Sequence, residues 1–237
     1  MAHNLLIVNG SPNPDGNSAL IEKKLIQRCV KTEFNLSTLD VNQYADLRFD
    51  GNSSMFRENK ISNKNVEEII NLFLSADSII IISPVYLHHI PAAFKNVLEY
   101  ISSMAHCFAL HHKFFSTIVH SNSNGELQTS AYIEKIFNYM GATFVERILF
   151  NDFSIHDELG EKISNLLRVH KNFLKSNRYD VSFAQEKEFS NLKSIVAVEK
   201  ENGIVSAKQK GWEILSNYDS YYQFISDIRN KSVNTYF

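Results

Sequence analysis

Four hydrogen-bonding side chains stand close together near the start of the chain, in the stretch GSPNPDGNS at 10–18. They are Ser11, Asn13, Asn17 and Ser18. Gly10 and Gly16 accompany them, and glycine lets backbone N–H groups approach an anion closely. A helical pattern follows, and the N-terminus of a helix carries about half a positive charge. Small donors in front of a helix N-terminus predict a cradle for a phosphate group.

Two common nucleotide fingerprints are missing from this stretch. It lacks GxxxxGK[ST], whose lysine and hydroxyl serve the hydrolysis of nucleoside triphosphates, and its glycine spacing does not fit GxGxxG. The simpler alternative is an ordinary turn in which Asn17 or Ser18 is the N-cap of the helix. The residues alone leave both interpretations open.

Two further candidate loops follow apolar runs. SPVYLHHIPAAFKN begins at Ser83, directly after the run IIII, and HSNSNGE occupies 120–126. The first of them offers an apolar and aromatic wall with backbone amides, which suits a flat conjugated ring better than a sugar. The alternative is a plain strand-to-helix connection in which Tyr86 packs on the core.

The elements that must position these loops alternate along the chain. Apolar runs predict strands at 4–9, 33–39, 78–83, 113–121 and 142–150. Helical periodicity predicts helices that begin at Ser18 and that span 66–74, 91–104, 127–141 and 157–175. Pro91 suits the first position of its helix, and Gly141 suits the left-handed residue that ends another. This alternation predicts an α/β fold with a five-stranded, parallel, doubly wound sheet in the order 2-1-3-4-5.

That strand order also predicts where a ligand binds. Ligands lie beyond the C-terminal ends of the strands, at the switch between the first strand and the third. The loop at 10–18 leaves the first strand at that point, and the loop that begins at Ser83 lies beside it. The loop at 120–126 follows the next strand. The three loops are therefore expected to share one edge of the sheet.

The last part of the chain, about 176–237, shows no such alternation. Apolar residues recur there at helical spacing, and ENG at 201–203 fits either a helix cap or a hairpin turn. We expect helices that form an extension packed on the domain or on a partner subunit. The expected division is 1–175 for the ligand-binding domain and 176–237 for the extension.

Composition narrows the class of protein. The 237 residues are 44% hydrophobic and 21% charged, and the formal net charge is −2. This balance favours a soluble protein without a nucleic-acid partner. Cys29 and Cys107, the only cysteines, are too few for a disulfide framework or a four-thiolate metal site. The run IIII at 79–82 is far shorter than a membrane span, so we expect a cytoplasmic protein with no membrane partner.

The paired motifs resemble a known family. GSPNPDGNS, followed by ADSIIIISPVYLHHIPAAFKNVLEYI, is similar to the NAD(P)H-dependent FMN reductase family of flavodoxin-like proteins. Those proteins carry a G-S-P…G-N-S/T loop and a P-x-Y-x4-P-x3-K-x3-D motif. The resemblance covers about 4–150 and implies a flavodoxin-like fold with FMN as the cofactor.

The resemblance also implies which residues bind the cofactor. It assigns the FMN phosphate to the first loop, with Ser11, Asn13, Gly16, Asn17 and Ser18. It assigns the lining of the isoalloxazine ring to the second loop, with Pro84, Val85, Tyr86 and Leu87. The other edge of the ring falls to the third loop, with Ser121, Asn122, Ser123, Asn124 and Gly125.

This sequence departs from the family pattern at three places. Asn13 stands where many relatives have a basic residue, so phosphate binding here depends on dipoles and neutral donors. Glu99 replaces the usual Asp of the second motif. The segment 47–59 contains no cysteine, which excludes the iron–sulfur cluster of some relatives.

The resemblance implies an oxidoreductase. Hydride from NADH or NADPH would pass through FMN to a small-molecule electron acceptor, such as a quinone, an azo or nitro compound, or free flavin. Hydride transfer requires no general acid or base, so we assign no catalytic side chain. Backbone amides at 85–87 and 122–125 are expected to hydrogen-bond the polar edge of the ring, with Tyr86 stacked on it. A homodimer or a homotetramer is the expected assembly.

Two other functions remain alternatives. A flavodoxin-type electron carrier would use a strongly acidic face for steering, and a net charge of −2 argues against it. A non-enzymatic FMN-binding protein would result if the extension blocked access for nicotinamide. The stretch HCFALHH at 106–112 lacks the spacing of metal ligands, and no base is defined for a Cys107 nucleophile. We therefore predict no metal site.

Overall fold

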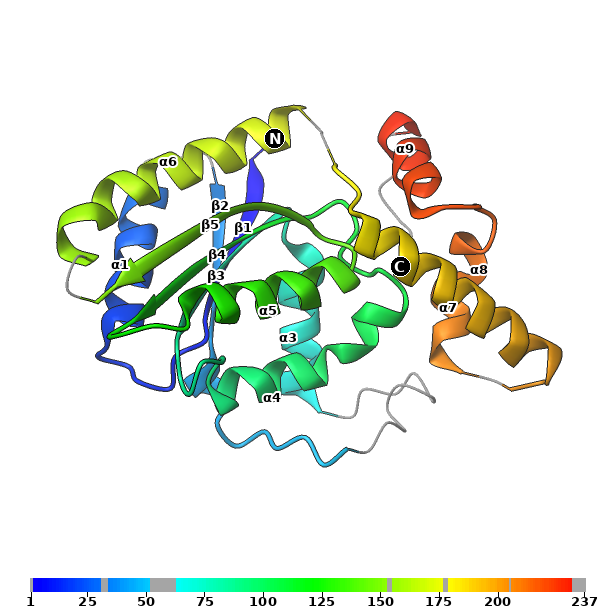
Figure 1. The fold of residues 1–237 in the computed structure, drawn as a ribbon, viewed down its shortest axis with the longest axis horizontal. Helices are drawn as coiled ribbons and strands as arrows, with labels where there is room; N and C mark the ends of the chain where they lie inside the picture. Colours follow the sequence, from blue (N-terminus) through cyan, green and yellow to red (C-terminus); the bar gives the residue numbers. More distant parts are fainter. Residues whose placement is uncertain are drawn as a thin grey trace.

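The computed structural model describes residues 2–30, 34–51, 63–152, 155–176, 179–204 and 206–231. Its centre is one five-stranded parallel sheet (Figure 1). The strands are β1 (His3–Asn9), β2 (Phe34–Asp40), β3 (Ser78–Pro84), β4 (Phe114–Ser121) and β5 (Thr143–Asn151). They lie in the order β2-β1-β3-β4-β5, which confirms the predicted topology. The start of the predicted strand at 33 lies outside the described residues.

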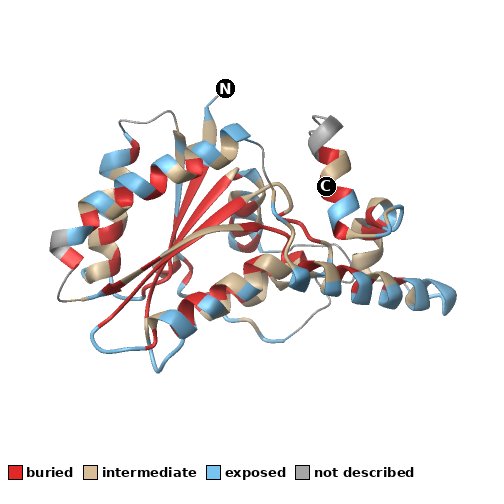
Figure 2. Cartoon of the chain, turned by 45° about the horizontal axis from the view of Figure 1, so that its top comes forward, coloured by how far each residue is buried: buried red, intermediate tan, exposed pale blue. Residues whose placement is uncertain are grey.

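Helices cover both faces of the sheet, as Figures 1 and 2 show. One face carries α1 (Asn17–Cys29) and α6 (Ile155–Ser176), and the other carries α3 (Lys64–Ser75), α4 (Ala92–Tyr100) and α5 (Glu126–Tyr139). The run IIII divides between the two cores, with Ile79 and Ile81 in one and Ile80 and Ile82 in the other. Strands buried on both faces are continuously apolar for this reason.

The helix ends follow local chemistry, with one correction. Gly141 has φ +97° after α5, and the N–H groups of Gly141 and Ala142 donate to the carbonyls of Asn138 and Phe137. This is a Schellman cap, which confirms the predicted end. The predicted helix 91–104 is wrong at both ends. Pro91 has ψ 149° and precedes α4, and the chain passes after Tyr100 into a short 3-10 helix, η2 (Ser102–His106).

The described part of the extension, after residue 176, is helical, as expected. It contains α7 (Phe183–Glu201), α8 (Ala207–Leu215) and α9 (Tyr221–Lys231). Gly203 has φ +66°, and Ile204 N–H donates to the carbonyl of Glu199, so ENG ends a helix and is not a hairpin turn. In Figure 1 these helices lie on the side of the sheet away from the arrowheads of the strands.

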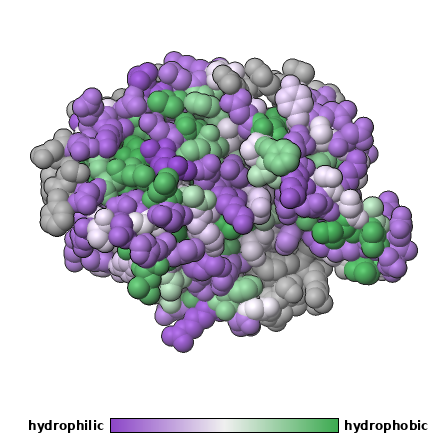
Figure 3. Space-filling view, in the orientation of Figure 1, coloured by the Kyte–Doolittle hydropathy of each residue, from purple (hydrophilic) through white to green (hydrophobic). Residues whose placement is uncertain are grey.

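A separate apolar cluster joins these helices to the rest of the chain. Phe108, from the histidine-rich stretch, is fully buried among Phe189, Trp212 and Tyr221. Trp212 Nε1 donates to the carbonyl of His106 at 2.7 Å, and Tyr221 Oη donates to a backbone carbonyl at 2.8 Å. The surface seen in Figure 3 is mainly hydrophilic, with hydrophobic patches at the outer end of these helices and on the opposite side of the view. None of the helices in the described part of the chain has the length and apolar character needed to cross a bilayer.

Candidate functional site

The three candidate loops meet at one edge of the sheet. Gly10 N–H, after β1, donates to the carbonyl of Ile82 in β3 at 2.9 Å. Val85 N–H, after β3, donates to the carbonyl of His120 in β4 at 3.0 Å. The sheet therefore places the loops after β1, β3 and β4 side by side at the C-terminal ends of their strands.

The first loop is folded tightly onto the sheet and onto itself. A Cβ at Gly10 would lie 2.8 Å from the ring of Phe94, so only glycine permits this close approach. Asn13 N–H donates to Ser11 Oγ at 3.1 Å, and Asp15 N–H donates to Asn13 Oδ1 at 3.1 Å. Ser11 is buried and Asn13 is exposed. The side-chain amide oxygen of Asn13 therefore already helps to hold the loop in its conformation.

Helix α1 begins without a side-chain cap. Its N-cap residue is Gly16, and no side-chain hydrogen bond caps the first turn. The alternative in which Asn17 or Ser18 is the N-cap is wrong, because both lie inside the helix. The first N–H groups of a helix have no acceptor within the helix itself. Together with the helix dipole they favour an anion at this position.

A buried histidine connects the start of α1 with the end of β5. Ser18 Oγ lies 2.8 Å from His120 Nε2, and His120 Nδ1 lies 2.7 Å from Asp152 Oδ1. Asp152 N–H donates to the carbonyl of Ser121, which fixes its position. Burial lowers the pKa of His120, while the Asp152 carboxylate acts in the opposite direction. Ser18 is 1% exposed, so its hydroxyl belongs to a buried chain of three polar groups.

The second loop contains a tight two-residue turn. Tyr86 N–H donates to the carbonyl of His89 at 2.8 Å, and His89 N–H donates back at 3.0 Å. The central residues, Leu87 and His88, have φ of 51° and 60°. Such φ values are costly for residues other than Gly, Asn and Asp. Tyr86 is 45% exposed and Leu87 is 99% exposed, so the turn presents apolar groups to solvent beside the first loop.

The third loop packs against the second. Gly125 has φ +97°, and a Cβ there would lie 2.9 Å from Val85 Cγ1. Ser121 Oγ donates to Glu126 Oε1 and accepts from Ser123 N–H at 3.2 Å. The exposed residues of this loop are Asn122, Ser123 and Asn124. Their polar groups therefore face outward next to the turn of the second loop.

Several of the backbone amides expected to face a ring already have partners. The N–H groups of Val85, Tyr86 and Ser123 donate within the protein. They are not available to a ligand in this conformation. Only the other backbone amides in 85–87 and 122–125 therefore remain candidates for hydrogen bonds to the polar edge of the ring.

Sequence reasoning missed His120 and Asp152. His120 is the penultimate residue of β4 and Asp152 directly follows β5. The missed signal is a polar residue at the C-terminal end of a core strand, where the predicted topology brings side chains together. Asn42 was missed as well. It lies in a short 3-10 helix, η1 (Val41–Tyr44), and its Nδ2 donates to the carbonyl of Ser11 at 3.1 Å.

The other candidate groups lie elsewhere and are used in packing. His111 contacts Phe224, and His112 contacts Tyr179. Burial raises the pKa of the Cys107 thiol to about 12, which removes it as a nucleophile at neutral pH. No group of three or more metal-ligating side chains is found in the described part of the chain.

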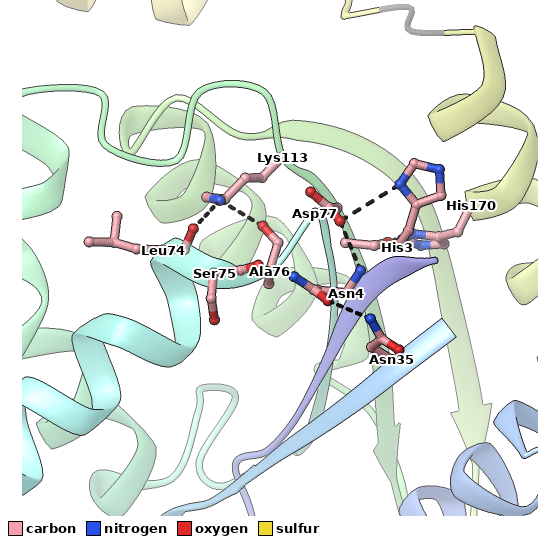
Figure 4. Close-up of polar contacts among 10 residues, drawn as sticks. His3, Asn4, Asn35, Leu74, Ser75, Ala76, Asp77, Lys113 and His170 are labelled. Atoms are coloured by element: carbon pink, nitrogen blue, oxygen red, sulfur yellow. Dashed lines mark hydrogen bonds and ion pairs between the residues drawn. The ribbon is translucent and has the colours of Figure 1, made fainter. Parts of the chain in front are cut away.

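The opposite edge of the sheet carries a polar cluster of its own (Figure 4). Lys113 Nζ donates to the carbonyls of Leu74 and Ala76, each at 2.6 Å, and so caps the end of α3. Asp77 Oδ2 accepts from Asn4 N–H at 2.8 Å and lies 3.7 Å from a His3 nitrogen. Its polar groups hold strand and helix ends together.

The comparison with family models gives one match. Residues 3–155 match the model described as NADPH-dependent FMN reductase. This range includes β1 to β5 and all three loops. No curated protein sequence matches the chain.

Solved structures match the fold at low sequence identity. An apo NADH:FMN oxidoreductase (EMOB) has a TM-score of 0.54 and 17% identity, covering 77% of this chain and 93% of its own. RosB with a bound 8-demethyl-8-formylriboflavin-5'-phosphate has a TM-score of 0.55 and 12% identity, covering 85% and 88%. An azoreductase from Bacillus anthracis has a TM-score of 0.50 and 14% identity, covering 71% and 97%.

Proposed function

We propose, since this chain belongs to the NADPH-dependent FMN reductase family, that its three adjoining loops hold FMN. The bound FMN would pass electrons to a small conjugated acceptor. Family membership makes the chain an NAD(P)H-dependent flavin oxidoreductase with FMN as its cofactor. The observation that carries it is the start of α1, where a helix N-terminus without a side-chain cap meets a loop of neutral donors.

The first loop fits the phosphate of FMN in both shape and polarity. Gly16 leaves the first turn of α1 uncovered, and a Cβ there would lie 3.0 Å from Asn13 Nδ2. The proposed phosphate ligands are the predicted residues of this loop: Ser11, Asn13, Gly16, Asn17 and Ser18. Backbone N–H groups and the helix dipole supply the attraction for the anion.

The second and third loops fit a flat ring. Val85 is half-buried against Gly125, and Tyr86 and Leu87 provide exposed apolar surface beside it. We propose that Pro84 to Leu87 line one side of the ring and that Ser121 to Gly125 meet its edge. These groups orient the ring and exclude water from it.

Bound FMN supplies the chemistry, which is acceptance of hydride from NADH or NADPH and its delivery to an acceptor. The protein positions the two rings and needs no proton-transferring side chain for that step. We propose a quinone, an azo or nitro compound, or free flavin as the acceptor, since the open, apolar rim at Tyr86 and Leu87 suits stacking of a conjugated molecule.

The same rim supports a proposal for the assembly. An apolar side chain that is 99% exposed beside a site is better explained if a second copy covers it. We propose that the chain forms a homodimer or a homotetramer. We also propose that the protein is cytoplasmic and that the chain divides into a flavin-binding domain, 1–175, and an extension, 176–237. Light scattering of the wild-type chain and of Leu87→Asp tests the assembly, and a monomeric wild-type chain contradicts it.

Reconstitution and reduction test the function. Purified protein is incubated with FMN, desalted and examined for bound flavin, and then mixed anaerobically with NADH or NADPH. We expect rapid bleaching by a pyridine nucleotide and turnover with one of the acceptor classes. Bleaching by a protein donor alone would instead identify an electron carrier, and bound flavin that neither donor bleaches would identify a binding protein.

A charge placed in the first turn tests the phosphate site. Asn17→Asp puts a carboxylate beside the proposed phosphate, and two unit charges about 4 Å apart repel by about 4 kcal/mol at an effective dielectric constant of 20. Solvent screening reduces this, so we expect FMN affinity to fall about thirtyfold. Asn172→Asp makes the same charge change on an exposed part of α6 and is the control. Equal affinity in both variants would contradict the phosphate assignment.

A further inference from the structure

The buried contacts of His120 have a consequence for the hydroxyl of Ser18. An ionised Asp152 carboxylate can only accept a hydrogen bond. His120 Nδ1 therefore carries a hydrogen and donates it to Asp152 Oδ1 at 2.7 Å. In a neutral ring Nε2 is then an acceptor. The contact of 2.8 Å between Nε2 and Ser18 Oγ is therefore donated by the serine. In this state the Ser18 hydroxyl cannot also donate to an anion.

Protonation of the ring reverses this arrangement. An imidazolium donates from both nitrogens, so Nε2–H would donate to Ser18 Oγ. The Ser18 hydroxyl hydrogen would then be free to turn toward a ligand at the start of α1. The same proton would add a positive charge directly behind the first loop.

The first loop has no positive charge of its own. Residues 10–19 contain no lysine, arginine or histidine, and their one charged residue is Asp15. A dianionic phosphate there depends on dipoles alone unless a neighbouring group becomes cationic. His120 can become cationic, and it is hydrogen-bonded to Ser18 in the first turn of α1.

Asp152 is the charged group that acts on the His120 ring, and further ionisable groups stand on the neighbouring elements. Asp152, after β5, contacts the ring. On α1, Glu22 accepts from Asn9 Nδ2, and on α5, Glu126 accepts from Ser121 Oγ. On α6, Lys162 lies over the ring of Phe150, the β5 residue paired with His120, and forms an ion pair with Glu158. The Asp152 carboxylate favours an imidazolium, and burial opposes it in the absence of an anion.

We propose that binding of a phosphate monoester in the first loop is coupled to protonation of His120, which releases the Ser18 hydroxyl to the phosphate and supplies the missing positive charge. His120 and Asp152 are positioning residues in this scheme, because they act on the ligand through Ser18. The inference rests on the proposed function, since it assumes that the first loop receives the FMN phosphate.

A hydrolytic role for the same three residues is disfavoured. Their order of contacts is that of a Ser–His–Asp triad. The chain belongs, however, to the NADPH-dependent FMN reductase family, whose chemistry is hydride transfer and not acyl transfer.

Proton uptake during FMN binding tests the proposal. The wild-type chain is titrated with FMN by calorimetry between pH 7.5 and 8.5, in two buffers of different ionisation enthalpy. The free phosphate is already dianionic in this range, because its second pKa is about 6. We expect uptake of close to one proton per FMN, and a Kd that rises up to about tenfold per pH unit.

Two comparisons assign the proton. Riboflavin lacks the phosphate, so its binding to the wild-type chain should take up no proton, and this comparison needs no variant. His120→Gln keeps an amide N–H for Ser18 Oγ but cannot titrate, so its FMN affinity should not change with pH in this range.

The outcomes separate the two proposals. Uptake with FMN but not with riboflavin, lost in His120→Gln, supports the coupling. Tight FMN binding by the wild-type chain without proton uptake overturns the coupling and leaves the FMN site intact. Absence of FMN binding overturns both.

Discussion

The two edges of the sheet each hold a buried histidine that is hydrogen-bonded to serine. At the edge with the three loops, which we call the open edge, His120 joins Ser18 to Asp152. Toward the other edge, His170 of α6 joins Ser78 of β3 to Ser116 of β4, with Nε2 2.7 Å from Ser116 Oγ. The second edge, with the cluster of Figure 4, is called the closed edge.

The two histidines differ in what surrounds them. Both ring nitrogens of His170 face serine hydroxyls, and Ser116 Oγ also accepts from Glu146 N–H at 3.1 Å. Burial lowers the pKa of His170 to about 3. His120 instead faces a carboxylate on one side and an uncapped helix start on the other. The same pair of side-chain types thus holds the fold together at one edge and responds to a ligand at the other.

Replacement of His170 should give the largest change in stability. His170→Leu places an apolar side chain of similar size in the site and removes the hydrogen bonds that the hydroxyls of Ser78 and Ser116 make to the ring. Each buried hydroxyl that loses its partner costs about 1–3 kcal/mol, so we expect a loss of about 3 kcal/mol, measured by urea denaturation. FMN affinity should not change.

The matched variant at the open edge is His120→Gln. It should cost less than about 1.5 kcal/mol, because the amide can still hydrogen-bond to Ser18 or Asp152. Equal losses of stability in the two variants would remove the distinction between the edges.

Acid should weaken the fold through the closed edge. In the unfolded chain a histidine titrates near 6.5, whereas the folded pKa of His170 is about 3 and that of His111 is also about 3, both lowered by burial. The stabilisation from keeping His170 neutral is therefore complete above pH 6.5 and is lost as pH falls toward 3.

The expected slope follows from linkage. One such group lowers the free energy of unfolding by about 1.4 kcal/mol per pH unit below pH 6.5. Urea titrations at pH 7, 6 and 5 should show this fall, and His170→Leu should show a slope that is smaller by about one proton. A free energy of unfolding that stays constant between pH 7 and pH 5 would refute the assignment.

The fold and the three loops could be predicted because their signals are local. The run IIII needs only its neighbours to indicate a doubly buried strand, and Gly141 ends a helix through its own backbone freedom. The topology then follows from the order of the elements. Pro91 was misplaced by one residue, because a proline suits both the N-cap region and the first turn.

The long-range contacts could not be predicted in the same way. Ser18 and His120 are 102 residues apart, and His120 and Asp152 are 32 apart. No local pattern connects them, and each by itself resembles an ordinary polar residue at the end of an element. The positive φ of Leu87 was equally hidden, since leucine is a poor residue for that conformation.

Lys113 offers a smaller test of the closed edge. Lys113→Met removes two hydrogen bonds to the end of α3 but also removes a buried charge. Burial lowers the pKa of Lys113 to about 8. The two effects oppose each other, so we expect a loss of about 1 kcal/mol. Lys95→Met, at a more exposed ion pair with Glu99, should cost less than about 0.5 kcal/mol and is the control. A larger loss in Lys95→Met would contradict the closed edge as the better-bonded region.

The turn of the second loop should give the smallest effect, and with the opposite sign. Leu87 has φ 51° and is 99% exposed, so Leu87→Asn relieves backbone strain without loss of packing. We expect a gain of about 0.5–1 kcal/mol in the free energy of unfolding. Leu127→Asn, at an exposed leucine in the first turn of α5, should give no such gain.

The same variant shows whether that strain serves the site. If Leu87 contacts the cofactor, Leu87→Asn should bind FMN more weakly while its free energy of unfolding rises. If Leu87 contacts a second copy of the chain, the variant should dissociate into monomers while its free energy of unfolding rises. A variant that is more stable, binds FMN equally and keeps its assembly would show that the strained turn has no such role. Strained conformations persist at functional sites because the surrounding structure holds them in place, and the turn at Leu87 and His88 is a strained conformation at the open edge.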